Sequence, residues 1–135
     1  MPAQVKPKVT SLLSIQEITK GDEMPIGAWV APPPADVDGL GNPNFITDKY
    51  YQLAKEAGIN ILYGLYENLE RRPEDALAAM NCALRSQLRY LAFSSGIPLK
   101  KSIKEMQTEL TSFCTDHPAY LGVLAYDEPA EAEFD

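Results

Sequence analysis

Four strand-like runs begin near residues 26, 60, 90 and 121, and a helix-like segment follows each of the first three. The spacing of about 30 to 34 residues matches the length of a β-strand plus its crossover helix. Regular alternation of this kind predicts a parallel sheet whose crossover connections are right-handed. We therefore expect an α/β fold built from four βα units.

The expected strands cover residues 25–31, 59–66, 90–93 and 121–126. The first is halted by three consecutive prolines, whose rings fit neither a helix nor a central strand. A long loop with several glycines then leads to the first helix. Four βα units amount to about half of a (β/α)8 barrel, whose usual size is roughly 250 residues. They would also form an open four-stranded sheet, and periodicity does not separate these two architectures.

Helix boundaries are marked by Thr47 as an N-cap, Gly58 as a terminator and Pro73 at a first helical position. Apolar residues recur at helical spacing in each segment. The predicted apolar faces are Tyr50, Leu53, Ala54 and Ala57; Leu77, Met80, Leu84 and Leu88; and Ile103, Met106, Leu110, Phe113 and Cys114. A fourth helix is expected to begin at Pro129. The predicted domain covers residues 24–135, and residues 1–23 read as an N-terminal arm or linker.

The charge of the chain limits the classes of partner that it is expected to bind. The formal net charge is -7, and basic residues occur singly or in pairs, without a run that could track a phosphate backbone. We therefore expect neither a nucleic-acid partner nor a membrane partner. No apolar stretch approaches the length of a spanning helix, and residues 1–20 lack the pattern of a signal peptide. The expected location is cytoplasmic, or secreted if an upstream segment precedes this chain.

Cys82, Cys114 and His117 are the residues that would first suggest metal or redox chemistry. The cysteines occupy apolar helical positions and have no second Cys or His at ligand spacing, so they are predicted to be buried thiols. His117 lies between a helix and the fourth strand, at the opposite end of the sheet from the strand tips, and a packing role is expected. We predict neither a metal site nor a cofactor.

The apolar run 121–126 ends in Asp127, Glu128 and Pro129. Carboxylates after a buried parallel strand lie where α/β folds keep their ligand sites. The alternative is structural, because acids ahead of a proline also cap the helix that follows.

The segment His117-Pro-Ala-Tyr-Leu-Gly-Val-Leu-Ala-Tyr126-Asp-Glu-Pro129 resembles the fourth-strand region of clan A glycoside hydrolase barrels. The first-strand segment 25–29 and the junction 57–60 are similar to this group in the same register. The resemblance implies a barrel fold and a general acid/base at Glu128, with a nucleophile on a seventh strand that this chain does not contain. Asp127 stands where the family commonly has Asn.

Glycosidic cleavage requires a protonated carboxyl beside the leaving oxygen, and an adjacent Asp127 with partial burial would raise the pKa of Glu128 accordingly. A second carboxylate is needed about 5 to 5.5 Å away for retention, or about 6.5 to 9.5 Å away for inversion. Glu67, just past the second strand, is the internal substitute that we predict for this partner.

Aromatic and hydroxyl side chains near the expected strand ends complete the predicted site. Trp29, Tyr66 and Tyr126 could stack on sugar rings, although aromatic residues also dominate cores. Ser94 is a candidate polar contact or a turn residue.

Three functional hypotheses follow. The first is a truncated glycoside hydrolase with little or no activity alone. The second is a non-catalytic half-barrel that binds carbohydrate or self-associates through open sheet edges as a homo-oligomer. The third is a self-contained small α/β domain.

Overall fold

The computed structural model describes residues 23–94 and 114–124 of the 135-residue chain. These residues form a four-stranded parallel sheet with strands in the order of the sequence. The strands are β1 (Gly27–Ala28), β2 (Ile61–Tyr63), β3 (Arg89–Phe93) and β4 (Tyr120–Leu124). The prediction of an α/β fold with a parallel sheet is therefore confirmed.

Two helices connect the first three strands. Helix α2 (Asp48–Glu56) follows a short 3₁₀ turn, η1 (Val37–Gly39), and helix α3 (Pro73–Arg85) leads into β3. The predicted helix boundaries are confirmed. Thr47 is the N-cap of α2, and Gly58, with a left-handed φ of 88°, follows its last turn. Pro73 is the first residue of α3. The expected helices around 103–114 and after 129 fall largely or wholly outside the described residues.

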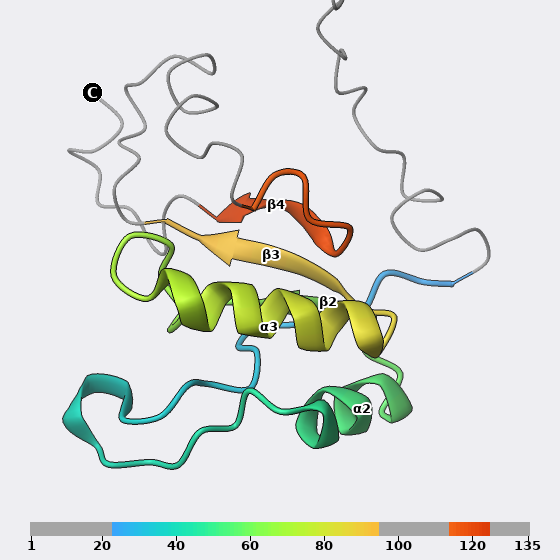
Figure 1. Ribbon diagram of the computed structural model, residues 1–135. Coiled ribbons are helices and arrows are strands. Elements are labelled where there is room, and N and C mark those ends of the chain that lie inside the picture. Colours follow the sequence, from blue (N-terminus) through green and yellow to red (C-terminus); the bar gives the residue numbers. More distant parts are fainter. Residues whose placement is uncertain (1–22, 95–113, 125–135) are drawn as a thin grey trace, which may run out of the picture.

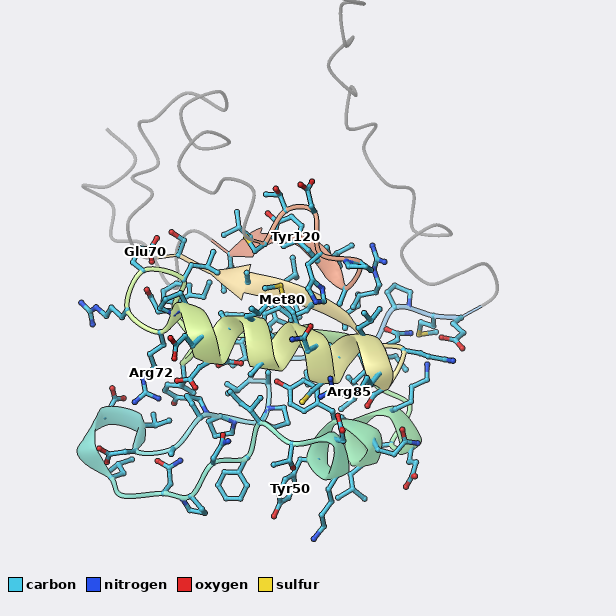
Figure 2. The ribbon with its side chains drawn as sticks, in the orientation of Figure 1. Tyr50, Glu70, Arg72, Met80, Arg85 and Tyr120 are labelled. Atoms are coloured by element: carbon cyan, nitrogen blue, oxygen red, sulfur yellow. The ribbon has the colours of Figure 1, made fainter. Side chains whose placement is uncertain are left out.

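Both helices pack on the same face of the sheet (Figure 1). Leu62 and Tyr90 are paired in the β2–β3 register, so their side chains point to one face, and both belong to the core beneath α2 and α3. Figure 2 places Met80 on the side of α3 that faces β3. Right-handed crossovers between consecutive strands require this one-sided arrangement.

The helix faces agree with the prediction only in part: Met80 and Leu88 are buried as expected, whereas three of the predicted leucines are not. Leu53, Leu77 and Leu84 are between 37% and 49% exposed, whereas Tyr51 on α2 and a row of small residues on α3 are fully buried. That row consists of Ala76, Ala79 and Ala83, and the larger Met80 is buried beside it. Small side chains let α3 approach the sheet closely, and the large side chains of Tyr51 and Tyr90 fill the space that remains.

Strand β1 is short and is held by a side chain. Asn60, which is 7% exposed, accepts a hydrogen bond from the Ile26 amide through Oδ1 at 2.7 Å and donates from Nδ2 to the Met24 carbonyl at 2.7 Å. The Asn60 and Ile61 amides both donate to the Ile26 carbonyl. Asn60 therefore fixes where the chain enters the sheet.

Candidate functional site

A cavity of about 390 Å³ lies at the carboxyl edge of the sheet. The arrowheads of β3 and β4 point toward this end of the molecule, where η1 and the start of α3 also lie (Figure 1). The cavity is enclosed by the loop after β1, the turn between β2 and α3, and the end of β3. We call it the edge cavity; its polar and aromatic lining consists of Asp36, Asp38, Tyr66, Asn68, Arg71, Arg72 and Phe93.

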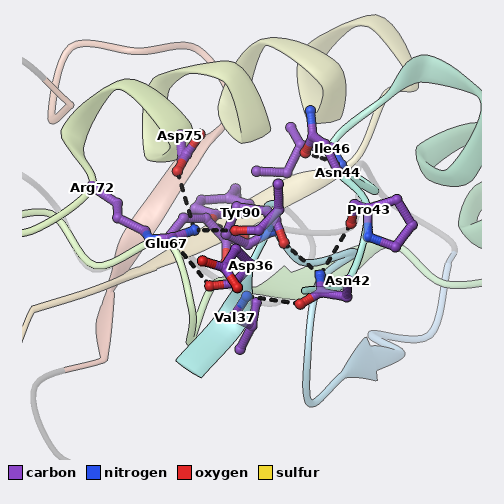
Figure 3. A network of polar contacts seen from close by, with 12 residues as sticks. Asp36, Val37, Asn42, Pro43, Asn44, Ile46, Glu67, Arg72, Asp75 and Tyr90 are labelled. Atoms are coloured by element: carbon purple, nitrogen blue, oxygen red, sulfur yellow. Dashed lines mark hydrogen bonds and ion pairs between the residues drawn. The ribbon is translucent and has the colours of Figure 1, made fainter. Parts of the chain in front are cut away.

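The first wall is the loop 34–43, which is organised by the side chain of Asn42 (Figure 3). Asn42 Oδ1 accepts from the Val37 amide at 2.7 Å, and Nδ2 donates to the Pro34 carbonyl at 2.8 Å. Asp36 Oδ1 accepts from the Gly41 amide at 2.9 Å, and the tip of the loop at Leu40 is 79% exposed. These bonds give the loop a fixed shape without regular secondary structure.

The second wall is the turn between β2 and α3. Asn68 Oδ1 accepts from the amides of Glu70 and Arg71, and the Leu69 amide donates to the Phe93 carbonyl at 3.0 Å. Arg72 then joins the two walls, because its guanidinium donates to the carbonyls of Ala35 at 2.9 Å and Asp36 at 3.3 Å. The same guanidinium pairs with Asp75 at 3.5 Å (Figure 3).

Three side chains of the edge cavity remain available to a ligand. Tyr66 is 41% exposed, and Asp38 and Arg71 are exposed with no side-chain partner among the described residues. An aromatic ring, a carboxylate and a guanidinium together can stack on a flat apolar surface, accept hydrogen bonds and donate them. This combination suits a polyhydroxylated ligand.

Glu67 lies in the same turn, but its carboxyl group is buried between the sheet and the helices. Its side chain is 0% exposed, and Oε1 accepts a hydrogen bond of 2.7 Å from the Tyr90 hydroxyl, whereas Oε2 has no partner among the described residues. Burial raises the pKa of Glu67 to about 7, and the nearby Asp75 adds to the rise, against the lowering effect of the Tyr90 hydrogen bond.

The other predicted site residues occupy different surroundings. Trp29 follows β1, is 54% exposed and lies with its ring centroid 5.8 Å from that of Tyr63. Ser94, at the end of β3, is fully buried and donates to Glu70. Tyr126, Asp127 and Glu128 lie outside the described residues. The structure thus brings Tyr66 to the edge cavity and directs Glu67 into the core.

The residues of the edge cavity that the sequence did not single out are Asp36, Asp38, Asn68, Arg71, Arg72 and Phe93. Arg71 and Arg72 stand directly before Pro73, at a helix start after a predicted strand, and Asp36 and Asp38 stand in the loop after the first strand. Both segments follow strands of one parallel sheet, so the sequence contained enough information to predict that they lie at the same edge.

His117 lies at the opposite edge, in the turn that enters β4. Nδ1 accepts a hydrogen bond from the Ala119 amide at 3.1 Å, so Nε2 carries the proton that it donates to Asn81 Oδ1 at 2.9 Å. Burial lowers the pKa of His117. This arrangement agrees with the predicted packing role.

Cys82 and Cys114 are both buried, as predicted. Residues 23–94 and 114–124 contain no group of three side chains that could hold a metal ion. Neither helix in these ranges has the length and apolarity needed to cross a membrane. Comparison of the chain with protein-family models, with curated proteins and with solved structures finds no match.

Proposed function

We propose that this chain is half of a (β/α)8-type barrel similar to the clan A glycoside hydrolases, and that its edge cavity binds carbohydrate. The supporting observation is the position of the edge cavity at the carboxyl ends of parallel strands that follow one another in sequence order. With their helices on one face, such strands have the arrangement of consecutive units in a barrel. Barrel enzymes bind their ligands at this edge.

The chemistry of the edge cavity supports a neutral sugar as the ligand. The apolar face of a pyranose ring stacks on Tyr66, and the hydroxyl groups of the sugar donate to Asp38 and accept from Arg71. Arg72 is occupied by the loop 34–43 and by Asp75, so it holds the walls in place rather than meeting the ligand.

Saccharide titrations of the full chain, followed by amide NMR shifts, test the proposal. We expect a neutral oligosaccharide to move the resonances of Tyr66, Asn68 and Arg71. Tyr66→Ala should weaken binding roughly tenfold through loss of stacking, Tyr66→Phe should retain it, and Leu84→Ala, on the exposed face of α3, should leave it unchanged. The absence of any saccharide-dependent shift across a panel of neutral sugars would contradict carbohydrate binding.

For catalysis, we propose Glu128 as the general acid/base, with Glu67 as its partner within the chain. Because the Glu67 carboxyl is enclosed and bonded to Tyr90, it reaches a sugar only after leaving the core. We therefore expect hydrolysis of aryl glycosides by the chain alone to be negligible. Turnover that Glu128→Gln abolishes would show that the chain is active by itself.

A second proposal is that two copies associate through β1. Among the described residues β1 pairs with β2 alone, and four apolar side chains around it are exposed: Met24, Ile26, Trp29 and Val30. An exposed apolar edge strand is a site for pairing with another chain. We expect light scattering to give a dimer that Ile26→Lys converts to monomer, and a wild-type monomer at high concentration would exclude this proposal.

A further inference from the structure

Three buried polar side chains from three different elements meet between the sheet and the helices. Glu67 comes from the turn between β2 and α3, Tyr90 from β3 and Tyr51 from α2, and each is 0% exposed. Only Tyr90 and Glu67 are joined by a hydrogen bond in the described structure, which leaves Glu67 Oε2 and Tyr51 Oη without partners. An unsatisfied buried polar atom destabilises the fold, and an ionised one does so far more.

The charged groups around Glu67 do not favour its ionised form. Asp75 on α3 is a group of like charge that raises the pKa of Glu67, and Arg72 is engaged by Asp75 and by the loop 34–43. Cys82 on α3 faces Tyr51, and no cation of the described residues forms an ion pair with Glu67. Burial therefore favours the neutral acid and raises the pKa of Glu67 to about 7, against the lowering effect of the hydrogen bonds from the Tyr90 hydroxyl and from the Glu67 and Tyr66 amides.

The position of Glu67 connects this buried group to the edge cavity. Its neighbours in sequence, Tyr66 and Asn68, both line the cavity, and the Leu69 amide holds the same turn to the end of β3. Because both neighbours line the edge cavity, that side is the exit we expect for a carboxylate that leaves the core. Such a movement changes the conformation of the turn that presents Tyr66.

We propose that Glu67 is a protonation-sensitive latch for the edge cavity. In the neutral form the carboxyl group stays bonded to Tyr90 and the turn 65–70 keeps the conformation described here. When the proton passes to bulk water, the carboxylate leaves the core toward the cavity and the turn moves with it. The effect on ligand binding rests on the proposed function, whereas the movement of the turn does not.

Amide NMR shifts of the ligand-free full chain between pH 5 and pH 9 test the latch. We expect Tyr66, Asn68 and Leu69 to titrate together with a midpoint near pH 7, and hydrogen exchange at Leu69 to accelerate beyond its intrinsic rise with pH. Glu67→Gln should abolish this titration, and Glu74→Gln, which alters an exposed carboxylate in the first turn of α3, should preserve it. An unchanged titration in Glu67→Gln overturns the proposal.

Tyr90→Phe provides a second test that keeps the carboxyl group. Because the Tyr90 hydrogen bond lowers the pKa of Glu67, its removal should move the midpoint to higher pH, and an unmoved or lower midpoint contradicts the latch. If a neutral saccharide binds, its affinity should fall severalfold from pH 6 to pH 8 in the wild type and stay constant in Glu67→Gln. If none binds, carbohydrate binding fails, and the amide titration still decides the latch.

Discussion

At the scale of single residues, Gly64 leaves the least room for a side chain among the glycines of the described residues. A Cβ placed on Gly64 would lie 1.7 Å from the hydroxyl oxygen of Tyr90 and 2.4 Å from its ring carbon Cζ. Gly64 therefore makes room for the phenol that binds Glu67, and its role is steric, since no left-handed φ is required there.

We predict that Gly64→Ala lowers the free energy of unfolding by about 3 kcal/mol, at the upper end of the cost of overpacking a core. Urea denaturation measures this change. Gly122→Ala is the matched control, because its Cβ would meet only the end of the Leu91 side chain at 3.2 Å. An equal loss in both variants would contradict the steric role of Gly64.

Asn60 offers a second prediction at this scale. Asn60→Ala removes both side-chain hydrogen bonds to the residues that enter β1 and leaves the Ile26 amide and the Met24 carbonyl unpaired. We expect a loss of about 2 to 3 kcal/mol in unfolding free energy. Hydrogen exchange should accelerate at the Ile61 amide, which donates to Ile26. Retained protection at Ile61 would show that β1 does not depend on this side chain.

At the scale of elements, α3 and the residues after it show why the apolar face was predicted only in part, since Met80 and Leu88 are buried as expected but Leu77 and Leu84 are exposed. The leucines at 77 and 84 follow the expected helical spacing, but so do Ala76, Ala79 and Ala83, which the structure buries. Hydrophobicity favoured the leucine face, whereas the close approach of a helix to a sheet favours small side chains. Tyr51 and Tyr90 then supply the bulk, and nothing in the local pattern of α3 reveals those partners.

This packing predicts effects of different size on stability for two substitutions on α3. Ala79→Leu enlarges a side chain that is 0% exposed and should destabilise the protein by about 1 to 3 kcal/mol. Leu77→Ala shortens a side chain that is 37% exposed and should change stability by roughly 0.5 kcal/mol or less. Thermal denaturation of the two variants checks the assignment of the buried face, and a reversed order would refute it.

At the scale of the whole molecule, stability should depend on pH through Glu67. Its pKa rises from 4.5 to about 7 on folding, so the folded state holds a proton that the unfolded state has lost between these values. Stability from this group is fully present below pH 4.5 and declines as pH rises through 7, by about 3 kcal/mol in total. The contribution of His117 to stability has the opposite pH dependence. Because burial lowers the pKa of His117, the unfolding free energy decreases as pH falls below 6.5.

Comparison of the wild type with Glu67→Gln isolates this contribution, since His117 is common to both proteins. The unfolding free energy of the wild type should fall relative to that of Glu67→Gln as pH rises from 5 to 8. A difference that stays constant over this range would mean that Glu67 is ionised in the folded protein throughout.

For the whole molecule, the sequence predicted the arrangement of the strands more accurately than it predicted the residues of the site. Alternating segments at regular spacing predicted parallel strands joined by crossover helices, and the structure adds their order in the sheet. The first two strands were predicted to end at residues 31 and 66, whereas β1 ends at Ala28 and β2 ends at Tyr63. The burial of Glu67 was not predictable, since it depends on Tyr90 and Gly64, which are distant from it in sequence or carry no local signal.

The loop 34–43 also has a practical consequence. Its base is fastened by Asn42 and Arg72, while Gly39, Leu40 and Gly41 at its tip project into solvent. Exposed tips of this kind accept insertions and are cut by proteases without loss of the surrounding structure. A reporter peptide inserted after Leu40 would therefore stand beside the edge cavity on an anchored base, where it could sense a ligand without taking part in holding it.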